Sequence, residues 1–165
     1  MTLVAWCSSS LRRVYSIKSK AGKLLRRTRK RTLAWSAPAP FAAGKTLAEA
    51  LLEPTRIYIK SVLPVLRSGL VSACAHITGG GLTENPPRVI AEHLVARFDW
   101  AAWEPPAVFD WLQRTGGVAD AEMRRTFNCG VGLILTVSPQ NAEPVLAALL
   151  NAGESAFVCG ELAPA

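Results

Sequence analysis

The residues with the clearest chemical potential form the run His-Ile-Thr-Gly-Gly-Gly at positions 76–81. Consecutive glycines present several backbone N–H groups with no Cβ in the way, and such groups hold anions. The run follows an apolar stretch, 70–75, that is typical of a buried strand, and precedes Thr-Glu-Asn-Pro-Pro at 83–87, which is typical of a helix start. The pattern indicates an anion site between a strand and a helix. A loose turn is the alternative interpretation of a glycine run taken alone.

Four further positions carry reactive or charged groups. Arg56 and Lys60 fall on the same face of a predicted strand, 56–60, either as an anion-facing pair or as solvated side chains. Cys129 precedes an apolar strand, and with no partner histidine evident we expect a small buried thiol rather than a nucleophile. His93 lies in a segment without a motif and is expected at the surface.

The elements that must position these residues follow from hydrophobic periodicity. Strands are predicted at 56–60, 70–75, 95–99, 133–137 and 156–160, and helices at 61–68, from 108, from 120 and at 141–151. Thr46 is expected to cap a further short helix. The pattern predicts one α/β domain, an α+β sandwich in which helices cover a mixed sheet of roughly four to six strands.

Composition limits the protein class. The chain has 165 residues, half of them hydrophobic, which is typical of one soluble globular domain, and no apolar run approaches the length of about 20 residues that crosses a bilayer. The four cysteines form no CxxC pair, so neither a zinc site nor a secreted disulfide framework is indicated. A reducing cytoplasm is the simplest expected compartment.

The charge is concentrated at the N-terminus. Ten of the 19 basic residues lie between Arg12 and Arg31, and no acidic residue precedes Glu49, so the net charge of +7 hides a mildly acidic body. We therefore divide the chain into a basic arm, 1–33, and a folded domain, 34–165. The arm has the composition of a polyanion-binding segment or of an organelle transit peptide.

Four motifs appear in an order and spacing that resemble a known family. They are Leu-Glu-Pro-Thr-Arg-Ile-Tyr-Ile-Lys at 52–60, Ala-His-Ile-Thr-Gly-Gly-Gly-Leu-Thr-Glu-Asn-Pro-Pro-Arg-Val at 75–89, Phe-Asp-Trp-Leu-Gln at 109–113 and Arg-Thr-Phe-Asn-Cys-Gly-Val-Gly at 125–132. Together they resemble the C-terminal half of aminoimidazole ribonucleotide synthetase, also called phosphoribosylformylglycinamidine cyclo-ligase. The likeness runs from about residue 35 to residue 162. Upstream of it, the family's serine-asparagine-glycine-tyrosine-serine-leucine stretch survives only as a trace at 14–17, which favours a third interpretation of the arm, as disordered or degenerate sequence.

The resemblance implies a function and a set of site residues. The family closes the imidazole ring of formylglycinamidine ribonucleotide in purine biosynthesis, using ATP and Mg²⁺. By resemblance, the N–H groups of the glycines hold a phosphate or phosphoryl oxygen, and Thr78 and Asn128 donate hydrogen bonds. His76 orients groups or handles protons, and Arg56 binds substrate. The catalytic candidates are His76 and Asn128, and the phosphate-binding candidates are Arg56, Thr78, Gly79, Gly80 and Gly81. For His76, a hydrogen-bonded histidine near the core is an equal alternative.

The family binds ATP and metal mainly through an N-terminal half that this chain does not contain. No acidic cluster suited to Mg²⁺ is evident here. We therefore expect a nucleotide substrate, a cyclo-ligase N-terminal half on another polypeptide, and no turnover by the chain alone. A homodimer remains open, no membrane association is expected, and nucleic-acid binding is not favoured. The alternative hypothesis is a non-catalytic binding module whose basic arm attaches to RNA or another polyanion.

Overall fold

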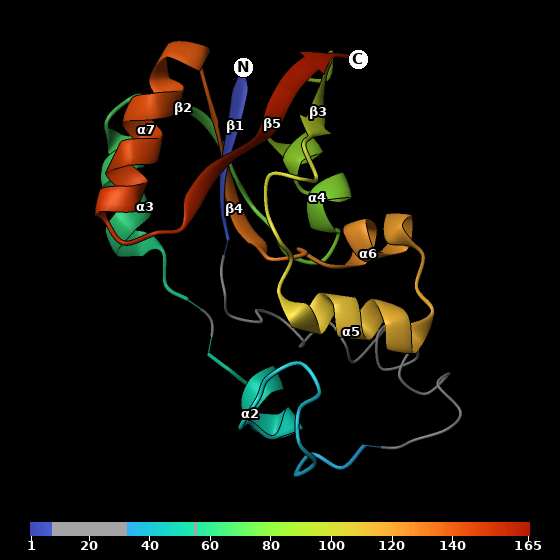
Figure 1. Ribbon diagram of the computed structural model, residues 1–165. Helices are drawn as coiled ribbons and strands as arrows, with labels where there is room; N and C mark the ends of the chain where they lie inside the picture. The colour runs from blue at the N-terminus through green and yellow to red at the C-terminus, as the bar shows by residue number, and fades with distance from the viewer. Residues whose placement is uncertain (8–32, 55) are drawn as a thin grey trace.

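An antiparallel sheet of five strands forms the centre of the part of the chain that the structure describes (Figure 1). The computed structural model describes residues 1–7, 33–54 and 56–165. The strands lie in the order β2-β4-β1-β5-β3, and each neighbouring pair is antiparallel. Their bounds are β1 Thr2–Cys7, β2 Val71–His76, β3 Leu94–Phe98, β4 Val131–Val137 and β5 Ala156–Pro164.

Helices pack on both faces and at one end of this sheet. In Figure 1, α3 and α7 lie together on one side, α4 and α6 lie on the other, and α5 and α2 extend beyond the end opposite the chain termini. The bounds are α2 Leu47–Leu51, α3 Ile59–Arg67, α4 Gly81–Glu84, the 3₁₀ helix η2 Pro86–Arg88, α5 Ala107–Gly116, α6 Asp120–Thr126 and α7 Pro139–Asn151. None of the helices in the described ranges is long and apolar enough to cross a membrane.

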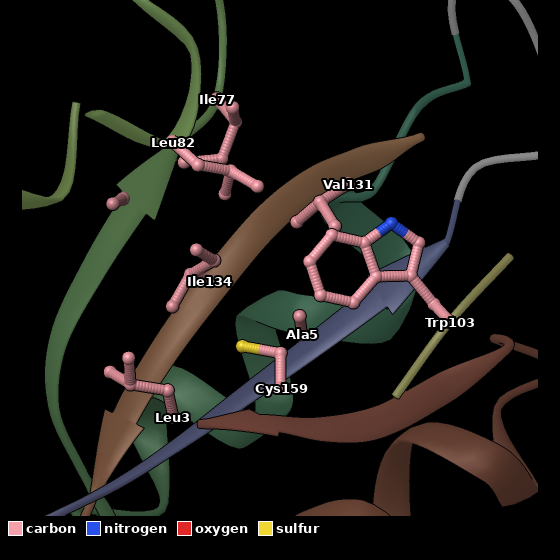
Figure 2. Packing of buried hydrophobic residues seen from close by; sticks show 9 residues of the cluster. Leu3, Ala5, Ile77, Leu82, Trp103, Val131, Ile134 and Cys159 are labelled. Carbon is pink, nitrogen blue, oxygen red and sulfur yellow. The ribbon is translucent and has the colours of Figure 1, made fainter. Parts of the chain in front are cut away.

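The strands divide their side chains between two hydrophobic cores, as the two-residue period of a strand requires. Leu3 and Ala5 of β1 point into a cluster with Trp103 and Cys159, shown in Figure 2. Val4, between them, points to the opposite face and packs with the buried residues of α3 and α7. All seven residues of β4 are buried. The two central strands β1 and β4 are therefore covered on both faces, and the site described below lies where β2 ends and β4 begins.

The predicted single domain of the α+β class is confirmed, with two differences in the sheet. The sheet is antiparallel throughout the described residues, not mixed. The predicted strand at 56–60 is wrong, because Ile59 begins α3 and Tyr58 is its N-cap residue. Ile57 and Ile59 are 79% and 64% exposed, so the alternation that suggested a strand does not reflect a buried face. The other predicted strands are present within one to four residues at their ends.

The first residues of the chain are an unexpected part of the fold. Thr2–Cys7 form β1, which pairs with β4 on one side and β5 on the other. The start of the segment that we predicted as a basic arm is therefore the middle strand of the sheet, and the boundary at residue 33 is wrong for residues 2–7. The basic residues 12–31 lie outside the described residues.

Candidate functional site

The glycine run forms a tight turn at the end of β2. The N–H of Ile77 still continues the sheet by donating to the carbonyl of Gly132 at 3.0 Å, and the N–H of Gly81 then donates back to the carbonyl of Thr78 at 3.0 Å. Gly80 and Gly81 have φ values of 104° and 56°, a region that side-chain-bearing residues rarely adopt. Gly80 and Gly81 are thus required by the turn itself, and α4 begins at Gly81.

The side chain of Asn85 lies against the inner side of this turn. Asn85 is buried, and its Nδ2 donates to the carbonyl of Gly81 at 2.7 Å and lies 3.4 Å from the carbonyls of Thr78 and Gly79. Our sequence interpretation quoted Asn85 within a motif but assigned it no role. The residue type of Asn85 could have indicated this role, because an amide group has two N–H donors that can reach several carbonyls of a nearby turn.

The geometry of the peptide group determines where the N–H groups of the turn point. In a trans peptide, the carbonyl of one residue and the N–H of the next point in opposite directions. Because the carbonyls of Thr78 and Gly79 face Asn85, the N–H groups of Gly79 and Gly80 face away from it. Neither N–H has a hydrogen-bond acceptor among the described residues, and Gly79 is exposed. The turn therefore presents two adjacent, outward-facing donors.

Close backbone contact joins the glycine turn to the region of Asn128. A Cβ on Gly81 would lie 2.0 Å from the carbonyl oxygen of Arg124 and 2.5 Å from that of Phe127, at the end of α6. The structure thus brings the glycine run beside the α6–β4 connection. Asn128 is buried, and its Oδ1 accepts from the N–H of Gly130 at 3.3 Å. That bond leaves its Nδ2 as the group for a ligand, and a substrate contact by Asn128 stays a prediction.

His76 lies on the α3 side of β2. Ala75 and Ile77 point into the opposite core, whereas the His76 side chain is exposed and lies edge-on to the ring of Tyr58, with 6.2 Å between ring centroids. The hydroxyl of Tyr58 in turn occupies the space above Gly132, where a Cβ would lie 2.0 Å from it. The hydroxyl of Tyr58 therefore fills the space that the missing side chain of Gly132 leaves. The part that His76 plays in catalysis stays a prediction.

Arg56 is held by the turn between α7 and β5. Its Nη2 lies 2.9 Å from Oε2 of the buried Glu154 and donates to the carbonyl of Gly153 at 3.1 Å. Oε1 of Glu154 accepts from the Ser61 hydroxyl at 2.6 Å. Arg56 and Lys60 do line one pocket, of about 340 Å³, but Glu154 lines it as well. The described hydrogen bond and ion pair of Arg56 are both with this turn between α7 and β5, and neither reaches the glycine turn. Substrate binding by Arg56 stays a prediction.

Cys129 is a buried thiol, as predicted. It is 7% exposed, its Sγ lies 3.7 Å from the carbonyl of Met123, and burial raises its pKa to about 11. It therefore stays protonated near neutral pH and is a poor nucleophile. Cys129 also lines a cavity of about 420 Å³ between α5 and α6. The carboxylates of Asp110 and Asp120 in that cavity contact Arg114 and Gln113.

Metal ligands do not gather anywhere in the described part of the chain. No group of three or more histidine, cysteine, aspartate or glutamate residues is arranged to hold an ion there. The described residues consequently do not fit a Mg²⁺ site, whereas the donors of the glycine turn fit an anion. What the turn can do chemically is hold and orient oxygen atoms that carry negative charge.

One comparison with known proteins bears on this arrangement. Residues 21–165 match the family model described as AIR synthase related protein, C-terminal domain. The match covers most of the chain and includes every candidate site residue, while β1 precedes it. The chain belongs to the AIR synthase related family and carries its C-terminal domain.

Proposed function

We propose that this chain is the C-terminal half of a phosphoribosylformylglycinamidine cyclo-ligase. The reaction would activate the amide oxygen of formylglycinamidine ribonucleotide by phosphoryl transfer from ATP. The ring nitrogen then attacks, and aminoimidazole ribonucleotide, ADP and phosphate are released. Such chemistry needs positioning and charge stabilisation around phosphate groups more than it needs a strong nucleophile. The family match supports the reaction class, and the four motifs support this member of the family.

The observation that carries the proposal is the pair of outward-facing N–H groups at Gly79 and Gly80. Preorganised donors of this kind stabilise charge because they need no reorientation when the charge develops. In the proposal they bind a phosphate or phosphoryl oxygen of the nucleotide substrate. Asn128, beside the turn, contributes a donor from its Nδ2, and the exposed His76 orients substrate or handles a proton. The hydroxyl of Thr78 lies 3.4 Å from Oδ1 of Asn85, so it reaches a ligand only by rotating away from Asn85.

In this proposal a second polypeptide binds ATP and Mg²⁺. The described residues of this chain do not fit a metal site, so no step is assigned to a metal here. A nucleotide-binding half on another chain supplies those groups, and this chain supplies the glycine turn. The chain alone is then expected to show no turnover.

Binding of inorganic phosphate tests the role of the turn. In Gly79→Pro one of the two donors is removed, whereas Gly79→Ala keeps it at an exposed position where φ is not left-handed. Phosphate titrations followed through the ¹H–¹⁵N resonance of Gly80 should show binding that is roughly 10- to 100-fold weaker for the proline variant, since a hydrogen bond to a charged group contributes about 1.5–3 kcal/mol. The alanine variant should bind like the unmodified chain. Equal affinities for all three proteins would contradict the proposal.

Turnover tests the need for a partner. Purified chain with ATP, Mg²⁺ and formylglycinamidine ribonucleotide should release no ADP above background. Addition of the nucleotide-binding half of a cyclo-ligase should give ADP release that depends on the substrate. Steady ADP release by the chain alone would contradict the need for a second polypeptide. A mixture that stays inactive although the two halves associate would contradict the assigned reaction.

A further inference from the structure

We propose that Asn85 is the positioning residue of this site, and that its carboxamide fixes the direction in which the N–H groups of Gly79 and Gly80 point. Asn85 does not touch the ligand in this arrangement. It acts by holding the carbonyls of the turn on the protein side. That the ligand is a phosphate rests on the proposed function, whereas the effect of Asn85 on the turn does not.

The orientation of the Asn85 amide is set by its neighbours on both sides. Its Oδ1 faces two donors, the hydroxyl of Thr78 and Nη1 of Arg88, each at 3.4 Å. Its Nδ2 faces only carbonyl oxygens, of Thr78, Gly79 and Gly81. A reversed amide would place oxygen against three oxygens and nitrogen against two donors. The amide group therefore has one favourable orientation, and in it Nδ2 makes one short bond and shares its second hydrogen between two longer contacts.

The backbone of Asn85 is fixed by hydrogen bonds within α4 and η2. Its N–H donates to the carbonyl of Gly81 at 3.3 Å, and its own carbonyl accepts from the N–H of Arg88 at 3.2 Å. The buried Pro86 follows, and it restricts the backbone further. Asn85 is thus anchored by α4 on one side and η2 on the other. Its amide can act as a fixed reference for a neighbouring segment that is itself intrinsically flexible.

The turn needs such a reference because glycine has the largest conformational freedom of any residue. Three consecutive glycines can adopt many backbone conformations, and most of them would turn the N–H groups of Gly79 and Gly80 elsewhere. The contact of Gly81 with α6 fixes only one end of the run. The contacts of Nδ2 with the carbonyls of Thr78 and Gly79 select one conformation at the other end.

Substitution of Asn85 by aspartate removes the N–H donor and keeps the size of the side chain. In Asn85→Asp an oxygen replaces Nδ2 and faces three carbonyl oxygens, so we expect the turn to lose its fixed conformation. The matched control is Asn141→Asp, because Nδ2 of Asn141 also donates to a backbone carbonyl, that of Leu70 at 3.2 Å, away from the turn. Asn85→Ala is the second variant, which removes the donor without adding repulsion.

Two readouts on the full chain test the inference. The heteronuclear NOE values of the Gly79 and Gly80 amides should fall to those of a mobile loop in both Asn85 variants, and inorganic phosphate should bind at least tenfold more weakly. Asn141→Asp should change neither. If the glycine amides stay as ordered as in the unmodified chain, the inference is wrong. If they become mobile in the variants but the unmodified chain binds no phosphate, the positioning role stands and the proposed function fails.

Discussion

Two buried cysteines make the stability of this protein sensitive to alkaline pH. Cys129 and Cys159 are 7% and 0% exposed, and burial raises their pKa values to about 11 and about 12 from an ordinary value near 9. Between about pH 9 and these raised pKa values, the two thiols lose their protons in the unfolded chain but keep them in the native protein. The contribution of the two buried thiols to native stability is therefore fully present below about pH 9 and is lost as the pH rises toward 11 and 12.

We expect the free energy of unfolding to fall with rising pH above 9, by ~1.4 kcal/mol per pH unit for each thiol. Denaturant titrations at intervals from pH 7.5 to 11 measure this slope. Lysine and tyrosine also titrate in this range, so the comparison that matters is with Cys159→Ala, in which one of the two contributions is absent. The variant should show the shallower slope, and equal slopes would refute the thiol argument.

At the scale of single residues, short-range patterns could be read from the sequence and long-range partners could not. The strand that precedes the glycine run and the buried thiol at Cys129 were predicted from residue types and their immediate neighbours. Arg56 was expected to bind substrate by resemblance, and that role stays a prediction, but its partners in the structure, the carbonyl of Gly153 and the carboxylate of Glu154, lie 97 and 98 positions away in the chain. Nothing in the surroundings of either residue in the sequence indicates that folding brings them together.

The packing of α4 against α6 depends on Gly81 at their closest approach. Gly81 has a φ of 56°, and a Cβ there would meet two backbone carbonyls of the α6 region within 2.5 Å. Backbone cannot move aside as a flexible side chain can, so any substitution must push the helices apart or distort the turn. The glycine at this position therefore serves both the local conformation and the contact between elements.

Substitution of two glycines with similar φ values separates these roles. Gly117, which ends α5, has a φ of 59°, and nothing lies within 4 Å of a Cβ built on it. Gly117→Ala should lower the unfolding free energy by about 1 kcal/mol, the cost of a left-handed conformation for a residue with a side chain. Gly81→Ala should cost about 1–3 kcal/mol more, because it adds overpacking. Thermal unfolding of both variants checks the difference, and losses of the same size would show that the helix contact is unimportant.

At the scale of elements, periodicity located most helices and strands but failed at their ends. The residues 56–60 alternate as a half-buried strand does, yet Ile57 and Ile59 are exposed and the pattern is accidental. The same stretch joins α3, whose buried Val62 and Val65 follow the helical period. Thr46 was correctly predicted to cap α2, where it forms a capping box with Glu49, because a cap is decided within a few residues.

For the whole molecule, the role of β1 could not be obtained from the order of motifs. Residues 3–7 of β1 form a continuous apolar run, which is typical of a strand covered on both faces, but its sequence position next to the basic segment concealed it. The family match also begins after it, at residue 21. The topology reveals its importance, since β4 and β5 are hydrogen-bonded to β1 and not to each other.

The native fold is therefore expected to require the first seven residues. Leu3, Val4 and Ala5 are completely buried between the two cores. A chain that begins at residue 8 loses these contacts and both central ladders of the sheet, so it should show neither a native circular dichroism spectrum nor a cooperative thermal transition. A graded version compares Leu3→Ala, expected to cost about 2–5 kcal/mol, with Val95→Ala on the edge strand β3, where Val95 is 41% exposed and the change should stay within about 0.5 kcal/mol. A truncated chain that unfolds cooperatively at the temperature of the full one would show that β1 is dispensable and that β4 and β5 can close the sheet without it.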